Sequence, residues 1–126
     1  MISKIRQSRA AFTLVEIMIV VAIIGLLAAL AVPGFVKARK QSQGRRILND
    51  VRQMDAAIDQ WALETGQSDG ATVSTTGAAT YLKGSWKTTD LLGNAYTIGT
   101  VGTNQIAVSA STKSALTGVG IDWGTY

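Results

Sequence analysis

The sequence contains no cysteine and no histidine, and it has a single proline. Without cysteine the chain forms no disulfide and has no thiolate nucleophile or thiolate metal ligand. Without histidine it lacks the side chain that most often serves as a general base and as a metal ligand. The eight acidic residues show no paired arrangement that is typical of a catalytic site. We therefore expect no enzyme, no cofactor and no metal.

Charge is also missing from one long stretch, between Glu16 and Lys37. The 20 residues between them match the length that an α-helix needs to cross the hydrocarbon core of a bilayer. We therefore predict a hydrophobic membrane helix over residues 12–36. Glu16 lies at the outer edge of this run, where a carboxylate is costly unless it reaches water or a partner.

The first 11 residues form a basic leader without any acid, and its cations are Lys4, Arg6 and Arg9. A basic leader before an apolar run is typical of a targeting segment, and two fates are open for it. Ordinary signal peptidase would cut after the A-x-A sequence at residues 29–31 and release a secreted protein. Alternatively, the apolar helix is retained. We favour retention, because the run is longer than that of a usual signal peptide, Pro33 would closely follow the cut, and Glu16 would head a discarded peptide.

The string from Ala11 to Glu16, A-F-T-L-V-E, resembles the prepilin signal of type IV pilins and type II secretion pseudopilins. The resemblance implies that a prepilin peptidase of the inner membrane cleaves between Ala11 and Phe12 and N-methylates Phe12. The family usually has glycine before the cut, and this chain has Ala11. The resemblance also implies a cytoplasmic N-terminus, which charge counting does not establish, since cations flank the apolar run at both ends.

Two roles are open for Glu16. The resemblance implies an assembly contact in which Glu16 of one subunit pairs with the Phe12 α-amine of the next. That pair would offset the desolvation of both charges. Locally, Thr13 and Glu16 have the spacing of a capping box, and an acid suits the first turn of a helix. We favour the intersubunit pair, and both roles can hold in different states.

Further along, Pro33 and Gly34 predict a kink or local melting of the helix. Residues 37–66 then continue as an amphipathic helix. Its apolar residues recur at spacings of four, three, four and three, and they are Ile47, Val51, Met54, Ile58 and Trp61. We expect this stripe to pack against the chain's own sheet and the helix to end at Thr65–Gly66. The polar residues off the stripe are expected to be solvated: Arg52, Asp55, Asp59 and Gln60.

Residues 37–46 hold a cluster of cations without interleaved aromatics, and this pattern does not support binding to nucleic acid. Contact with acidic lipid head groups, or with Asp50 and Asp55 of a neighbouring subunit, is open. We interpret the cluster as a solvated face with some intersubunit contacts.

Residues 67–126 predict a small β-rich region. We expect an exposed loop over residues 67–77 and two strands at 96–101 and 105–110, joined by a hairpin loop. The side chains expected to face the helical stripe are Ile98, Ile106 and Val108. The tail through Tyr126 is expected to add a strand or cover an edge. Three acids could supply oxygen ligands to calcium: Asp69, Asp90 and Asp122. The sequence has no dense acidic loop, so we expect no calcium site.

Taken together, these features predict an α+β, pilin-like fold. In it, a long N-terminal helix with a hydrophobic first half packs in its second half against a small antiparallel sheet. The resemblance implies a structural subunit of a type IV pilus-like filament, held in the bacterial inner membrane before assembly. Its implied partners are other copies of itself, prepilin peptidase, the assembly machinery and membrane lipid. One alternative is a type II secretion major pseudopilin, and another is a non-assembling secreted or membrane-anchored protein.

Overall fold

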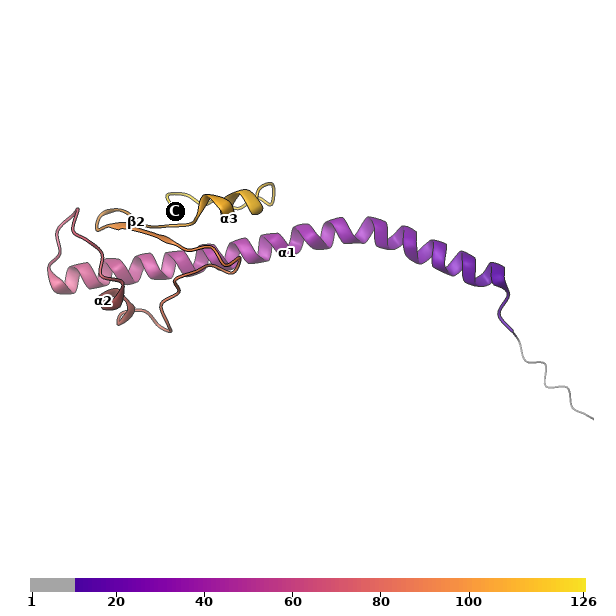
Figure 1. Cartoon of the computed structure of the whole chain (residues 1–126), viewed down its shortest axis with the longest axis horizontal. Helices are drawn as coiled ribbons and strands as arrows, with labels where there is room; N and C mark the ends of the chain where they lie inside the picture. The colour runs from indigo at the N-terminus through magenta and orange to yellow at the C-terminus, as the bar shows by residue number, and fades with distance from the viewer. Residues whose placement is uncertain (1–10) are drawn as a thin grey trace, which may run out of the picture. The chain divides into compact units, whose positions relative to one another are not determined.

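The structure is a computed structural model, and it describes residues 11–126. The described residues form five elements in chain order: α1 (Leu14–Thr65), α2 (Thr75–Ala79), β1 (Thr97–Thr100), β2 (Thr103–Ala107) and α3 (Ala110–Ala115). Figure 1 labels α1, α2, β2 and α3 along the chain. The chain divides into two compact units, Met1–Val36 and Lys37–Tyr126, and α1 contributes to both.

The described part of the first unit is dominated by the apolar half of α1. Every residue from Ala11 to Val36 is exposed in the isolated chain, large aliphatic side chains included. A window of 18 residues in α1 has a mean hydropathy of 2.9, enough for a membrane span. The helix is unbroken through Pro33 and Gly34, so a kink or melting there in an assembled filament stays a prediction.

In the second unit, the predicted stripe forms one side of the hydrophobic core. All five stripe residues are buried, at 8% exposure or less. The end of α1 is also as predicted, since Gly66 has a φ of +67°. The Gln67 amide donates to the Ala62 carbonyl at 2.8 Å. This bond and the left-handed glycine together form a Schellman cap, which satisfies a carbonyl that the last helical turn leaves free.

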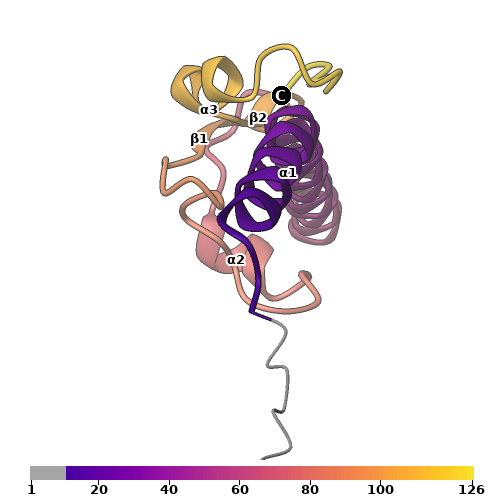
Figure 2. The same cartoon turned by 90° about the vertical axis from the view of Figure 1, so that its right-hand side faces the viewer.

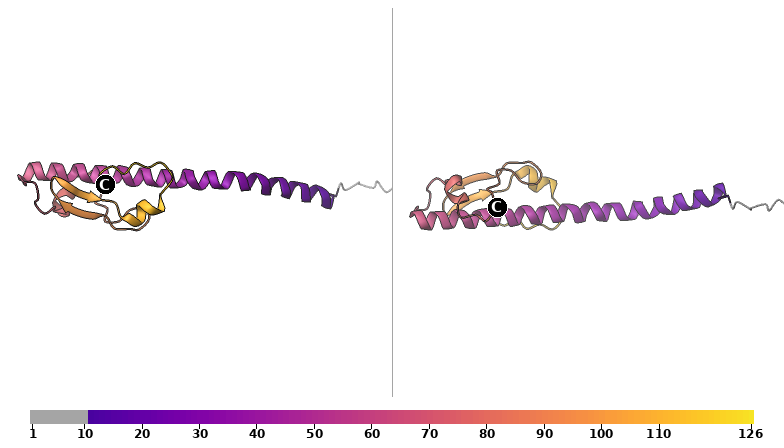
Figure 3. Two further views of the ribbon diagram at one scale, coloured as in Figure 1. Left: turned by 90° about the horizontal axis from the view of Figure 1, so that it is seen from above. Right: turned by 90° about the horizontal axis from the view of Figure 1, so that it is seen from below.

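The sheet is a two-stranded antiparallel hairpin that lies along the second half of α1 (Figure 3). Thr97 pairs with Ala107 and Ile98 with Ile106, and an irregularity follows at Gly99. Ile106 and the nearby Val108 are buried in the same core cluster as the stripe, and Ile98 packs against it. The expected orientation of the three side chains is confirmed, as is the α+β arrangement of a long helix on a small sheet.

The loop predicted over residues 67–77 is wrong in its second half. Val73 is buried, and Ser74 caps the short helix α2 by accepting a hydrogen bond from the Gly77 amide at 3.1 Å. Ala78 of α2 is fully buried. Small polar residues dominate this segment, and serine competes well at an N-cap, so a short helix forms where the composition indicated a loop.

The second strand ends earlier than predicted, at Ala107. Ser109 caps α3 by accepting from the Thr112 amide at 3.2 Å, and this cap replaces the end of the expected strand. The described residues after α3 contain no strand, and the tail covers the core instead, through Ile121, Trp123 and Tyr126. Figure 2 shows α2, β1 and α3 to one side of the second half of α1.

Candidate functional site

The residues predicted to be processed and to direct assembly lie at the start of α1. Ala11 and Phe12 precede the helix, and the Phe12 side chain is 82% exposed. Thr13 caps the helix: its hydroxyl accepts from the Glu16 amide at 3.2 Å, and its own amide donates to Glu16 Oε2 at 3.3 Å. These two bonds are the reciprocal pair of a capping box. The local role of Glu16 is therefore present in the isolated chain.

Glu16 keeps capacity for a further partner. An ionised carboxylate offers about four acceptor positions, and the capping box occupies one of them with a long bond. The side chain is exposed, so a donor from outside the chain can approach it. The geometry is compatible with the pairing to a second subunit that the sequence predicted, and that pairing stays a prediction.

The surface beyond Glu16 is an apolar cylinder with small residues in it. A Cβ built at Gly25 meets nothing within 4 Å, and the same holds at Gly34. Small residues let helices approach one another closely in lipid or in a bundle. This half of α1 therefore offers an open apolar face to lipid or to other helices.

The second unit holds several acids, and internal contacts account for most of them. Asp50 forms an ion pair with Lys87 at 2.7 Å. Asp55 accepts from Gln105 Nε2 at 3.0 Å and from the Tyr126 hydroxyl at 3.0 Å. The two acids proposed to meet the basic cluster of a neighbour are thus engaged within their own chain.

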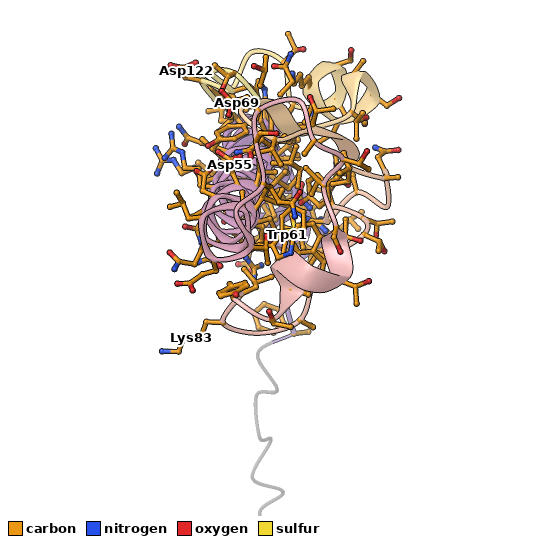
Figure 4. All side chains as sticks on the ribbon, turned by 90° about the vertical axis from the view of Figure 1, so that its left-hand side faces the viewer. Asp55, Trp61, Asp69, Lys83 and Asp122 are labelled. Atoms are coloured by element: carbon orange, nitrogen blue, oxygen red, sulfur yellow. The ribbon has the colours of Figure 1, made fainter. Side chains whose placement is uncertain are left out.

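The prediction that Asp59 is solvated is confirmed, since Asp59 is exposed, whereas Asp55 is half-buried. Gln105 Nε2 also donates to Asp59 Oδ1, at 2.7 Å. The side-chain amide of Gln105 therefore bridges two carboxylates on consecutive turns of α1. Local sequence pattern missed this link because Gln105 lies 46 and 50 residues away from its partners. Figure 4 labels Asp55 on α1 and shows Trp61 next to α2.

The three acids considered for calcium do not form a site. Among residues 11–126, no group of three or more acidic side chains is placed to hold a metal ion. Asp90 is buried, and its carboxylate accepts from the amides of Leu92 and Asn94 at 2.9 and 3.1 Å and from the Thr112 hydroxyl. It fixes a turn and ties that turn to α3.

Tyr96 is the one polar side chain in the described part of the chain that is buried without a hydrogen-bond partner. Burial is the main cause that raises its pKa to about 12, and the negative charges of Asp50 and Asp90 add to it. Tyr126 also has a raised pKa, through burial and then through its hydrogen bond to Asp55. Neither tyrosine lies in an arrangement that could carry out acid–base chemistry at neutral pH.

Known proteins resemble the N-terminal half of this chain. Residues 6–32 match the family model described as the prokaryotic N-terminal methylation motif. Type II secretion system core protein G of Klebsiella michiganensis is 34% identical over 62 residues, which cover 49% of this chain and 44% of that protein. Type IV major fimbrial protein FimA of Dichelobacter nodosus is 40% identical over 67 residues, 53% of this chain and 43% of FimA.

A further relative, core protein G of Pseudomonas aeruginosa, is 39% identical over 59 residues, 47% of this chain and 42% of that protein. The chain thus matches less than half the length of each of these relatives. No solved structure matches it significantly. The chain carries the methylation motif, and its homologues are type IV pilins and type II secretion protein G.

Proposed function

We propose that this chain is a structural subunit of a type IV pilus-like filament, anchored in the inner membrane by the first half of α1 before assembly. One observation carries the proposal. The residues that match the methylation motif begin an apolar helix that stays exposed over residues 14–36. A helix of this kind needs lipid, and after leaving the bilayer it needs other helices.

Assembly follows from the asymmetry of the chain. The apolar half of α1 is exposed along its whole length in the isolated chain, so its partner must be another copy or lipid. Contacts between different surfaces of identical subunits generate a helical filament when the rotation between subunits does not close into a ring. The proposed partners are therefore other copies, together with prepilin peptidase and the assembly machinery. The role is structural rather than catalytic.

Processing prepares the N-terminus for this contact. Cleavage between Ala11 and Phe12 exposes a new α-amine close to the Thr13–Glu16 capping box. An α-amine has an ordinary pKa near 7.7–8.0, so it is largely cationic at neutral pH. The Glu16 carboxylate of a neighbouring subunit pairs with it and sets the axial register between subunits.

A variant pair tests the assembly role of Glu16. We expect Glu16→Ala to be processed normally but to be missing from filaments sheared off the cell surface. The matched control is Glu64→Ala, because Glu64 is the chain's other glutamate and, within residues 11–126, its side chain bonds only to Gln60, at 2.9 Å. Equal filament yields from the two variants would contradict the proposed pair.

A second candidate is a major pseudopilin of a type II secretion system, which the similarity to core protein G favours. Deletion of the gene separates the two. Loss of long surface filaments supports the pilus subunit, whereas loss of an exported enzyme from the medium with filaments intact supports the pseudopilin. A secreted protein cut after Ala31 would give neither result.

A further inference from the structure

The segment of α1 that follows the apolar half concentrates positive charge. Residues 37–46, called the basic segment below, contain five cations and no acid. All five are exposed, and they are Lys37, Arg39, Lys40, Arg45 and Arg46. Within residues 11–126 there is one ion pair, between Lys87 and Asp50. No cation of the basic segment is therefore paired with an acid of the described chain.

The remainder of the second unit has the opposite sign. Residues 47–126 contain four basic and seven acidic residues, a net charge of −3 against +5 for the basic segment. The positive charge therefore collects on the stretch that directly follows Val36 in the sequence. An anionic surface next to the apolar helix would meet this charge first.

The basic segment borders a shallow, open recess on the surface of α1. The recess has a volume of about 320 Å³ and lies between the side chains of Ala38, Gln41, Ser42, Arg45, Arg46 and Asn49. The recess has two guanidinium groups, two amides and a hydroxyl, and no acid. Guanidinium groups bind phosphate oxygens through paired N–H donors, and neutral amides and hydroxyls complete such a site. The chemistry of the lining fits a phosphate group.

Helix geometry directs these cations towards the apolar half. The Cα–Cβ bonds of an α-helix tilt towards its N-terminus, so long side chains extend back along the helix in that direction. The basic segment covers about 14 Å of helix axis from Lys37 to Arg46. Lysine and arginine can extend further along an apolar surface while their charged ends stay hydrated. When the apolar half lies in a bilayer, the cations reach the level of the head groups.

We propose that the basic segment binds the phosphate groups of anionic phospholipids, with Arg45 and Arg46 as its main contacts. The proposal rests on the proposed function in one respect, that residues 12–36 span the bilayer. Cations near an anionic leaflet attract its lipids over about one Debye length. The contact holds the subunit in the bilayer, so assembly must break it when the subunit leaves the membrane.

The test uses the full chain in nanodiscs that contain equal amounts of phosphatidylglycerol and phosphatidylcholine. Native mass spectrometry counts the lipids of each kind that stay bound when the protein is released. We expect phosphatidylglycerol in clear excess on the unaltered chain. The double variant R45Q/R46Q should lower the ratio of the two lipids by about fivefold for each charge removed.

The matched control is R52Q/K83Q, which also removes two exposed cations but lies outside the basic segment. We expect it to keep the ratio of the unaltered chain. The leader cations are the same in all three chains, so the differences report on the second unit. Circular dichroism verifies that each variant folds.

Three results would overturn the proposal: equal retention of the two lipids by the unaltered chain, equal loss in both double variants, or an unchanged ratio in R45Q/R46Q. The last result, together with lost cross-linking between copies, would assign the segment to a subunit contact. A different result would show that the proposed filament function is wrong: cells would lack filaments of this chain, while the preference for phosphatidylglycerol in nanodiscs would persist.

Discussion

Substitution of Gly77 by alanine should destabilise the second unit, although alanine favours helices. A Cβ built at Gly77 would lie 2.4 Å from Trp61 Nε1 and 2.8 Å from Trp61 Cδ1, distances that the chain must relieve by moving. Trp61 is buried in the core against α2, so its ring cannot retreat freely. The added methyl group also lies 3.2 Å from Ser74 Oγ, the cap of the same helix.

The magnitude follows from two opposing effects. Overpacking a buried site costs roughly 1–3 kcal/mol, and replacing glycine by alanine in a helix returns up to about 1 kcal/mol. With an overpacking cost in the middle of its range, about 2 kcal/mol, the net loss in the free energy of unfolding is about 1–2 kcal/mol. In a domain of this size each kcal/mol shifts Tm by roughly 4–8 °C. We expect Gly77→Ala to melt about 4–16 °C below the unaltered chain.

Thermal unfolding of the full chain in detergent, followed by tryptophan fluorescence, measures this shift. Gly34→Ala is the control, because a Cβ at Gly34 meets nothing within 4 Å and Gly34 lies in the other unit. In a double-mutant cycle, Trp61→Leu should reduce the cost of Gly77→Ala, since the two residues are in contact. A Gly77→Ala chain that melts at or above the Tm of the unaltered chain would contradict the predicted clash with Trp61.

Two further predictions use the same unfolding assay. Ile58→Ala should lower the free energy of unfolding by about 2–5 kcal/mol, because Ile58 is fully buried. Leu63→Ala on the same helix should lower it little, because Leu63 is 79% exposed. Similar losses in the two variants would contradict the assigned core face. The Tyr96 pKa is raised in the folded chain to about 12 from an ordinary 10, so its contribution to stability is complete below pH 10 and is lost as pH rises to 12. Tyr96→Phe should remove this loss of stability at alkaline pH. It should cost little stability at pH 7, because the Tyr96 hydroxyl has no hydrogen-bond partner. An unchanged dependence of stability on alkaline pH would show that another group causes the loss.

The sequence predicted the parts of the fold that depend on periodic patterns. The spacing of Ile47, Val51, Met54, Ile58 and Trp61 identified the core face of α1, because one face of a helix repeats every 3.6 residues. The hairpin was also predicted, and its strands differ from the expected ones mainly at their ends.

The missed features depend on contacts that a local pattern does not encode. The two short helices begin at Ser74 and Ser109, in stretches whose composition equally suits a loop or a strand. The bridge from Gln105 to Asp55 and Asp59 joins residues that only the folded chain brings together. For the candidate site, the capping box at Thr13 and Glu16 was readable from their spacing, whereas cleavage at Ala11 and the contact between subunits depend on other molecules.

Processing and assembly are tested together by the N-terminal sequence and the intact mass of the protein in filaments sheared from cells. We expect a chain that begins at Phe12 and is heavier by one methyl group than the cleaved sequence. A chain that begins at Val32, or one that is found only in the culture medium and never in filaments, would contradict it.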